Sequence, residues 1–499
     1  MLSEFDYSEL EKQATSLYAN LESQLYKEIV KRINAVGYAN TVVENNANIL
    51  QEMGVLYSDI VTTIAKETES TYDKISQILY NAGVKSISYD DEIYIAAGLN
   101  PIKINQSTSM VQLINATIAN TSGNLKNLVN TTANTTQTSF YNAMNLAYLE
   151  VTTGSKSYSQ AIIDAIENLS KYGLTVEYPS GYKSTLENAV RTNILTSTSQ
   201  MCGKLQEMRA EELGWDLMEL TAHAGARPSH AEWQGGIVSL SGKSGYLSKE
   251  AIGYGEVDGF KGINCRHDWF PYYEGSSRAY SQELLDEYKN ATVTYNGETM
   301  SLYDATQLQR SMEKQIRADK RQLISLQEAM KNTSLSSKDL ESYKTAFARK
   351  TLYYNTHKNE LQSLVNQTNL AQDSVRTIVA NYSKSVSSNV SAVTKIANQY
   401  NNSNIVGTVV NGTKITKIGE HIISRTYARE LTVEDVVDCL QNPLECGTIE
   451  TDKQGRNSFP AIGSNVTVYI NPDTGVITTV HATSSKKLEE LEKQKNENN

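Results

Sequence analysis

The chain is poor in several residue types that often mark a function. Its 499 residues include only four Cys, seven Pro, three Trp and six His. Four cysteines over this length are too few for a disulfide scaffold, which favours a reducing compartment or assembly inside a cell. There is no run of about 18 apolar residues, and no basic segment followed by an apolar one opens the chain. We therefore expect neither a membrane span nor a standard secretion signal.

An excess of positive charge is also missing. Lys and Arg number 46 against 56 Asp and Glu, and the formal net charge is -10. This balance argues against a protein that coats nucleic acid, although a local basic site remains open. An apolar fraction of 39% and a mean hydropathy of -0.44, with abundant Asn, Thr, Ser, Gln and Tyr, are typical of long helices with polar faces. The length predicts several domains.

Hydrophobic periodicity predicts that most of the chain is helical. Apolar residues recur every three or four positions from Leu10 to Ile33, which indicates a long amphipathic helix at the start. We expect a helical body over residues 1–215, continuing through the Thr-rich stretch 130–136, and a helical extension over residues 281–384. Between them, over residues 216–280, Gly and aromatic residues crowd together, which predicts a small Gly-rich α+β module.

The last hundred residues change texture again. Residues 385–404 are rich in Ser, Asn, Val and Ala, and we predict that they form a linker. A small α+β domain is expected over residues 405–485, followed by a charged polar tail at 486–499 that frays. The predicted fold class is therefore multidomain and mainly α.

Turn and capping residues define the elements of this last domain. A helix is expected from about Gly419 to Glu430, and a second one begins at Thr432, with Asp435 three residues later, and ends at Asn442-Pro443. Two β-rich runs, 466–470 and 476–482, flank a turn that contains Asn, Pro, Asp and Gly, which predicts a hairpin.

The module contains most of the side chains that could bind a metal. His223, His230, Cys265 and His267 form two short pairs of donors that suit a tetrahedral zinc site. Both spacings differ from the usual ones, and structural zinc is therefore the alternative to a cofactor-free, hydrogen-bonded loop core, which we favour. In that core, His223, Arg227 and Arg266 form hydrogen bonds with loop carbonyls and carboxylates, while Trp233 and Trp269 fill a small hydrophobic core. No local nucleophile is paired with a base, which argues against catalysis here.

The same segment resembles the phage minor capsid protein 2 family, which is related to phage head-morphogenesis proteins. The similarity rests on three runs: His223-Ala-Gly-Ala-Arg-Pro-Ser-His-Ala-Glu-Trp-Gln-Gly235, Gly253-Tyr-Gly-Glu-Val-Asp-Gly-Phe260 and Asn264-Cys-Arg-His267. Arg227, Trp233, Gly235 and Arg266 belong to these runs and are expected to be structural. Weaker similarities extend it over residues 7–330. The resemblance implies a virion protein near the portal or in the capsid interior, assembled in the host cytoplasm beside portal and major capsid proteins.

A second group of reactive side chains lies in the last domain. His421, Arg425 and Arg429 recur every four residues, so they share one face of a helix, and Thr479 and His481 share one face of the last strand, with Thr478 on the other. Such a group can cleave RNA without a metal. His421 and His481 would act as acid and base in either order, Arg425 and Arg429 would hold the phosphate, and Thr478 or Thr479 would orient it.

This domain is similar to phage-associated nuclease domains of the type that includes barnase, EndoU and RNase colicins. The resemblance implies a toxin-like endoribonuclease, an RNA substrate such as a tRNA or another host RNA, and a cognate immunity protein. Acidic residues outnumber basic ones between Ile405 and Ala482, so the substrate would have to be recognised selectively. The alternative is a purely structural protein whose last domain is a non-catalytic binding module, with Arg425 and Arg429 paired to Glu430 or Glu434.

Overall fold

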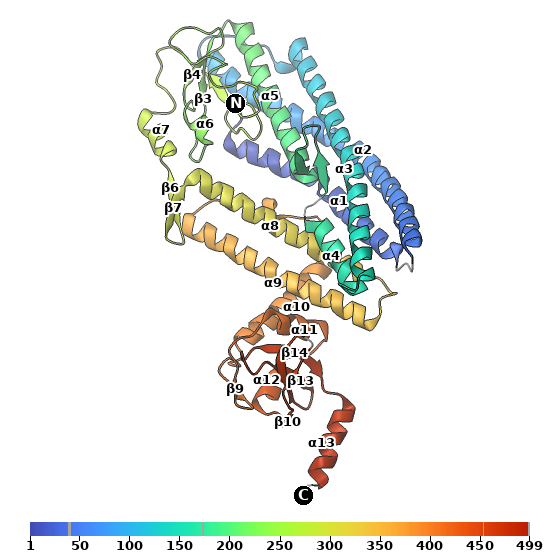
Figure 1. Cartoon of the computed structure of the whole chain (residues 1–499). Helices are drawn as coiled ribbons and strands as arrows, with labels where there is room; N and C mark the ends of the chain where they lie inside the picture. Colours follow the sequence, from blue (N-terminus) through green and yellow to red (C-terminus); the bar gives the residue numbers. More distant parts are fainter. Residues whose placement is uncertain (38–40, 172–173, 381, 453, 498–499) are drawn as a thin grey trace.

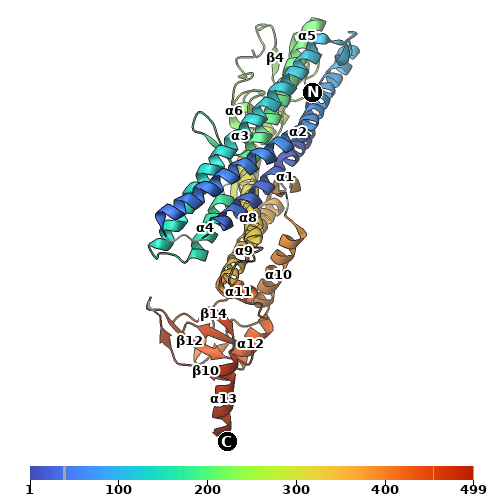
Figure 2. The same ribbon diagram turned by 90° about the vertical axis from the view of Figure 1, so that its right-hand side faces the viewer.

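The protein is elongated and mainly helical. The computed structural model describes residues 1–37, 41–171, 174–380, 382–452 and 454–497. A helical body forms most of the molecule, the Gly-rich module lies at the end near the N-terminus, and the small C-terminal domain lies at the opposite end (Figures 1 and 2). No helix in the described ranges is long and apolar enough to cross a membrane.

Long helices lying side by side form the body (Figures 1 and 2). They are α1 (Glu4–Val36), α2 (Val42–Ala96), α3 (Thr108–Thr152), α4 (Tyr158–Lys171) and α5 (Leu186–Leu213). Ser3, Thr41 and Thr185 cap α1, α2 and α5 through their hydroxyls. The predicted apolar stripe of α1 is buried at Leu10, Ala14, Leu21, Leu25, Ile29 and Ile33, while the side chain of Leu17 lies outside the described part of the chain.

Helix α3 continues through the Thr-rich stretch as predicted. The hydroxyls of Thr131, Thr132, Thr135 and Thr138 each donate to the carbonyl four residues earlier, so these polar side chains are satisfied within the helix. Two small elements interrupt the helical body and were not predicted. They are the 3-10 turn η1 (Ile104–Gln106) and a hairpin of β1 (Thr175–Glu177) and β2 (Lys183–Thr185).

The module is built on a three-stranded antiparallel sheet. Its central strand is β3 (Leu217–Leu220), flanked by β4 (Ile237–Ser239) and β5 (Trp269–Pro271). The short helix α6 (Pro228–Ala231) follows β3 and has Pro at its first position, where no backbone N–H is needed. The remaining residues of the module are loops and turns, as the Gly content predicted.

The extension is helical over most of its length but opens with a hairpin. After α7 (Gln282–Lys289) the chain forms β6 (Thr292–Tyr295) and β7 (Glu298–Ser301), and then α8 (Leu302–Ala329), α9 (Ser337–Thr368) and the 3-10 turn η2 (Ser374–Thr377). Asn296 and Gly297 both have positive φ, 51° and 85°, as a two-residue hairpin turn requires. The prediction of uniform helix from residue 281 was wrong, because it overlooked that Asn-Gly between β-branched residues is a hairpin signal.

The segment 385–404 is not a linker. It forms the helix α10 (Lys384–Asn401), capped by the Ser383 hydroxyl, and buries Val386, Val390, Val393 and Tyr400. The Tyr400 hydroxyl lies 2.6 Å from Thr426 Oγ1, inside the C-terminal domain. The polar residues of this helix form its outer face. Its few apolar residues recur along the inner face and attach the C-terminal domain to the body.

The C-terminal domain has two helices and an antiparallel sheet. The helices are α11 (Glu420–Ala428) and α12 (Val433–Gln441), and α12 is capped by Thr432 and ends at Asn442, as predicted. Its strands are β8 (Val409–Val410), β9 (Thr413–Lys414), β10 (Glu445–Cys446), β11 (Glu450–Thr451), β12 (Asn457–Ile462), β13 (Val466–Ile470) and β14 (Ile477–Ala482).

The main sheet of this domain has the order β10-β12-β13-β14, with β11 also paired to β12 and β8 paired to β9 as a separate hairpin. The predicted hairpin of β13 and β14 is confirmed. Ala348 of α9 and Val393 of α10 lie in the same hydrophobic core as the domain. The polar tail is the helix α13 (Ser485–Glu497) rather than a frayed end.

Candidate functional site

Strand pairing brings the two signature loops of the module together. Leu220 at the end of β3 is opposite Trp269 at the start of β5, and the Thr221 N–H donates to the Asp268 carbonyl at 2.8 Å. The loop after β3 leads to His223 and the helix α6, and the loop before β5 carries Cys265 and His267. Two segments about forty positions apart in sequence therefore meet at the edge of one small sheet.

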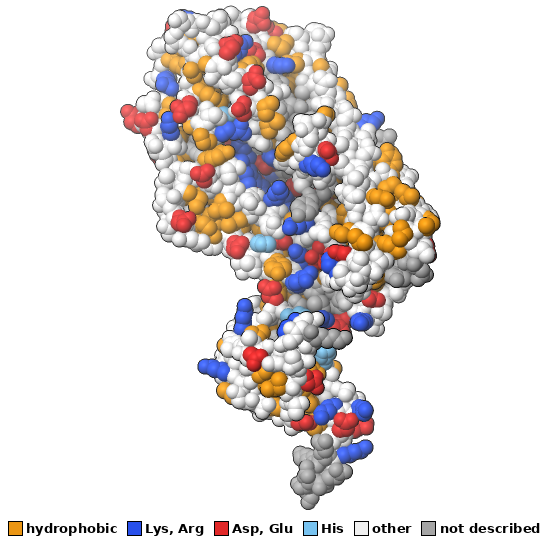
Figure 3. Space-filling view, viewed as in Figure 1, with side chains coloured by type: hydrophobic (Ala, Val, Ile, Leu, Met, Phe, Trp, Pro, Cys, Tyr) orange, Lys and Arg blue, Asp and Glu red, His pale blue; other side chains and the backbone are white. Residues whose placement is uncertain are grey.

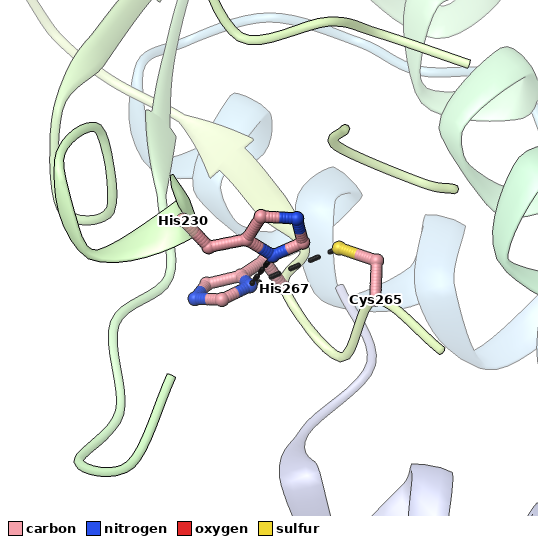
Figure 4. A group of neighbouring side chains, drawn as sticks. All are labelled: His230, Cys265 and His267. Carbon is pink, nitrogen blue, oxygen red and sulfur yellow. Dashed lines mark hydrogen bonds between the residues drawn. The ribbon is translucent and has the colours of Figure 1, made fainter. Parts of the chain in front are cut away.

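Three of the four predicted metal donors, His230, Cys265 and His267, gather where these loops meet (Figure 4). Candidate ligand atoms of His230, Cys265 and His267 all lie within 4.8 Å of one another, and all three residues are buried. The Nδ1 atoms of His230 and His267 are 3.3 Å apart, and Cys265 Sγ is 3.8 Å from His267 Nδ1. The His223 ring stacks on that of His267 with centroids 4.5 Å apart.

The surroundings of His230, Cys265 and His267 disfavour their charged forms. Burial lowers the pKa of His267 well below 6.5, and the neighbouring His223 and His230 lower it further. Burial also lowers the pKa of His230, and it raises the pKa of the Cys265 thiol. Neutral imidazoles and a thiol that can lose its proton are suitable ligands for a metal ion.

The four motif residues support the loops around this group. Arg227 donates to the carbonyls of Asp258 and Ile263 at 3.3 and 3.1 Å. Trp233 is buried, and its ring contacts those of His230 and Phe260. Gly235 has a φ of 68°, and a Cβ there would lie 2.7 Å from a side-chain carbon of Leu285, so glycine lets α7 pack closely.

Arg266 leads from the module into the helical body. It forms an ion pair with Glu11 of α1 at 2.6 Å, and Glu11 also meets Arg376 at 3.0 Å and Arg191 of α5 at 3.6 Å. Burial raises the pKa of Glu11, but the three guanidinium groups outweigh this and hold it below its usual value. One carboxylate thus joins the module, α1, α5 and η2.

These arginines lie at a cavity of about 270 Å³ between the module and the body. Six basic residues line it: Arg191, Arg266, Arg310, Lys314, Arg317 and Arg376. Figure 3 shows Lys and Arg side chains gathered in the middle of the body. Burial and the neighbouring Arg266 and Arg376 lower the pKa of Arg310 to about 10, which reflects the local excess of positive charge.

A second buried ion pair lies beside the metal-donor group. Lys261 Nζ is 2.6 Å from Asp268 Oδ1, and both side chains are fully buried. Asp268 also accepts hydrogen bonds from the N–H groups of Leu2 and Trp269, at 2.6 and 2.8 Å. Burial lowers the pKa of Lys261, but the Asp268 carboxylate outweighs it and the net shift is upward. This pair fixes the module to the first residues of the chain.

The predicted residues of the C-terminal domain lie on α11 and β14, which pack against each other. Arg429 Nη1 donates to Thr479 Oγ1 at 3.3 Å and to the Val480 carbonyl. His421 and His481 have exposed side-chain surface, but the atoms around them partly desolvate both rings; this lowers the pKa of each, and Arg425 and Arg429 lower both further. Thr478 donates its hydroxyl to the Tyr469 carbonyl at 3.1 Å, and among the described residues it makes no hydrogen bond with either arginine.

Both arginines bind a carboxylate from the helical body. Glu341 Oε1 of α9 accepts from Arg425 Nη1 at 2.6 Å and from Arg429 Nε at 2.9 Å. The expected partners were wrong: Glu430 pairs with Lys344 at 2.5 Å, and Glu434 accepts from Gln399 at 3.0 Å. The alternative prediction was therefore right that a carboxylate binds these arginines, but it assigned that role to the C-terminal domain and not to α9.

Residues 4–349 match the family described as phage minor capsid protein 2. The chain belongs to this family. It is also similar to a "Structural protein" of Lactococcus phage LL-H, with 27% identity over 344 residues that cover 65% of this chain and 90% of that relative. No solved structure matches. As a phage minor capsid protein, the chain is a structural component of the virion.

The family match covers one of the two candidate sites. The module and Glu341 lie within residues 4–349, whereas His421, Arg425 and Arg429 lie beyond them. The ion pairs of Glu341 therefore join the family region of this minor capsid protein to its C-terminal domain.

Sequence reasoning missed Glu11, Lys261 with Asp268, and Glu341. Asp268 was detectable in part, because it follows directly after Cys265-Arg-His267 in the signature. Glu11 and Glu341 lie in ordinary polar helix faces, and only the tertiary arrangement shows that each meets two or three arginines.

Proposed function

We propose that this minor capsid protein lies at the portal or in the capsid interior, contacts portal and major capsid proteins through its helical body, and cleaves RNA with its C-terminal domain. The supporting observation is the packing of α11, which carries His421 and Arg425, on β14, which carries Thr479 and His481, with Arg429 bound to the Thr479 hydroxyl where the two meet. The resemblance of this domain to barnase-type and colicin-type nucleases supports the same activity. A cognate immunity protein would protect the cell in which such a virion assembles.

The proposed reaction uses only groups of the protein. Arg425 and Arg429 hold the phosphodiester and stabilise the charge that develops on it. One of His421 and His481 removes the proton of the 2′-hydroxyl, and the other protonates the 5′-oxygen that leaves. Thr479 contacts Arg429 and keeps its guanidinium group directed toward the phosphate.

Glu341 defines a closed form of this site. A single carboxylate oxygen bridges Arg425 and Arg429, in the position where a phosphate oxygen would bind. RNA must displace this carboxylate before the arginines can hold a phosphate. The domain would therefore be least active while it is docked on α9.

The same contact favours a second candidate function, a non-catalytic docking module. Arg425 and Arg429 would then serve only to attach the domain to the body through their ion pairs with Glu341. The core that the domain shares with Ala348 and Val393 adds to this attachment. In that case the histidines have no chemical role.

RNA cleavage by the full chain distinguishes the two. Glu341→Gln removes the charge that competes with phosphate, so we expect faster cleavage of total cellular RNA than by the unchanged protein. Adding His481→Ala to this variant should lower the rate by about 10²–10⁴-fold, because an acid or base is lost. Glu430→Gln, which disturbs the neighbouring pair with Lys344, is the matched control and should leave the rate unchanged. The docking function predicts intact RNA with every variant.

The pH profile of cleavage provides a separate prediction. The pKa values of His421 and His481 lie below 6.5, because burial and then Arg425 and Arg429 disfavour their charged forms. A reaction that needs one neutral and one protonated histidine should give a bell-shaped profile with its optimum on the acid side of pH 6.5. Arg425→Gln removes a positive charge and should raise both pKa values, moving the optimum of kcat/KM upward. A profile that does not respond would contradict the assignment.

A further inference from the structure

The metal-donor group of the module has a hydrogen-bond pattern that leaves several lone pairs directed at one point. His230 Nε2 lies 2.8 Å from the Asp258 carbonyl oxygen. A carbonyl oxygen only accepts hydrogen bonds, so this nitrogen carries the proton of the neutral ring. His230 Nδ1 is therefore a bare acceptor, and it faces His267.

His267 has the same tautomer for an equally firm reason. Its Nε2 lies 3.1 Å from Gln234 Oε1, and that oxygen also accepts from the His223 backbone N–H at 3.1 Å. The backbone N–H can only donate, which fixes the orientation of the Gln234 amide and makes His267 Nε2 a donor. Two bare Nδ1 atoms then lie 3.3 Å apart inside the module, an arrangement that repels unless a cation lies between them.

The spacing agrees with coordination of one metal ion. Zinc–nitrogen bonds of about 2.0–2.1 Å and zinc–sulfur bonds of about 2.3 Å, at tetrahedral angles, place two nitrogens about 3.3 Å apart and a nitrogen and a sulfur about 3.6 Å apart. The separations here are 3.3 Å between the nitrogens and 3.8 Å between His267 Nδ1 and Cys265 Sγ. The carbonyl and amide oxygens behind the rings are the outer partners that histidine ligands of metals usually have.

A fourth donor lies next to the three. His223 Nδ1 is 3.1 Å from the Ala224 carbonyl, so its Nε2 is the bare nitrogen. This Nε2 is buried and has no hydrogen-bond partner among the described residues. The ring already stacks on His267, and turning it toward the other three donors would complete a tetrahedral set.

We propose that the module binds one Zn²⁺ ion through His230 Nδ1, His267 Nδ1 and Cys265 Sγ, with His223 Nε2 as the fourth ligand. Three imidazole nitrogens and a thiolate suit zinc, whereas Mg²⁺ and Ca²⁺ need oxygen ligands. The site is closed and buried, which fits a structural ion rather than a catalytic one. The ion would tie the loop after β3 to the loop that carries Arg266, which binds Glu11 of α1, and Asp268, which binds the N–H of Leu2 before α1.

Metal analysis of the full chain tests this proposal. After dialysis against zinc and then against metal-free buffer, we expect about one zinc per chain, and removal by a chelator should lower the Tm. Removing an outer partner of a ligand typically weakens metal binding about tenfold or more, and Cys265→Ser, which removes a ligand, should weaken zinc binding far more than that. Cys446→Ser, in the C-terminal domain, is the matched control and should bind zinc normally. A metal-free protein, or normal binding by Cys265→Ser, overturns the site.

Cobalt substitution keeps the test decisive if Cys265→Ser does not fold. The unchanged protein loaded with Co²⁺ should show a thiolate-to-cobalt charge-transfer band and the intense visible bands of tetrahedral coordination. Absence of the charge-transfer band would rule out Cys265 as a ligand. His223→Gln tests the fourth position: weaker binding by about tenfold or more supports His223, and unchanged affinity removes it from the ligand set.

Discussion

Lys261→Met should destabilise the protein by about 3–5 kcal/mol, because it leaves the Asp268 carboxylate buried without its counterion. The pair is fully buried, with 2.6 Å between Lys261 Nζ and Asp268 Oδ1, and methionine cannot neutralise the charge. Denaturant unfolding followed by circular dichroism measures the change in the whole protein. Trp fluorescence, recorded in parallel, follows unfolding of the module separately. The N–H groups of Leu2 and Trp269 would remain bound to the carboxylate, so part of its stabilisation should survive.

A double variant and a surface control separate charge from packing. The double variant Lys261→Met with Asp268→Asn should lose less unfolding free energy than the two single variants lose together, since no uncompensated charge remains. Lys243→Met breaks an exposed pair with Glu274 and should leave the unfolding midpoint nearly unchanged. Equal effects of the Lys261 and Lys243 changes would show that the buried pair contributes nothing special.

Glu11→Gln should cost about 3 kcal/mol or more, because three guanidinium groups lose the carboxylate between them, although Arg376 keeps a 3.9 Å contact with Glu313. The variant keeps the size of the side chain and one acceptor oxygen, so a loss of stability reports charge rather than a cavity. Arg191, Arg266 and Arg376 come from three separate parts of the chain, and their repulsion should loosen the module from the body. Faster hydrogen exchange in residues 262–268 and in the first turns of α1 would locate the change.

This carboxylate also gives the stability a dependence on pH. The pKa of Glu11 in the folded protein lies below its ordinary value of 4.5, so its contribution is complete above that value and is lost as the pH falls through the lower, folded pKa. The difference in stability between the unchanged protein and Glu11→Gln should therefore shrink in acid. Glu9→Gln, which breaks the exposed pair with Lys12 on the same helix, should show no such difference.

Local signals predicted much of the fold. The repeat from Leu10 to Ile33 indicated α1, and Thr432 with Asp435 located the start of α12, because periodicity and capping depend on residues near in sequence. The segment 385–404 was predicted wrongly for the opposite reason: Val386 and Val390 are buried in the core of the helical body, and Val393 and Tyr400 in the C-terminal core. A polar helix that depends on distant partners resembles a linker when its own sequence is considered alone.

The candidate sites divide in the same way. The metal donors were identifiable because they occur in two short, unusual runs, and the structure brings all four together. Arg425 and Arg429 were identifiable from their spacing on one helix. Their partner Glu341 is more than eighty residues away, and no local pattern connects it to them.

Helix α9 has a consequence for how this protein can diversify. The family match ends at residue 349, within α9, while Glu341, Lys344 and Ala348 on the preceding turns contact the C-terminal domain. A phage that exchanged this domain for another would inherit a helix surface shaped and charged for the lost one. We expect exchange to succeed only where the recombination point lies before Ser337, so that α9 and α10 travel with the domain as one heritable unit.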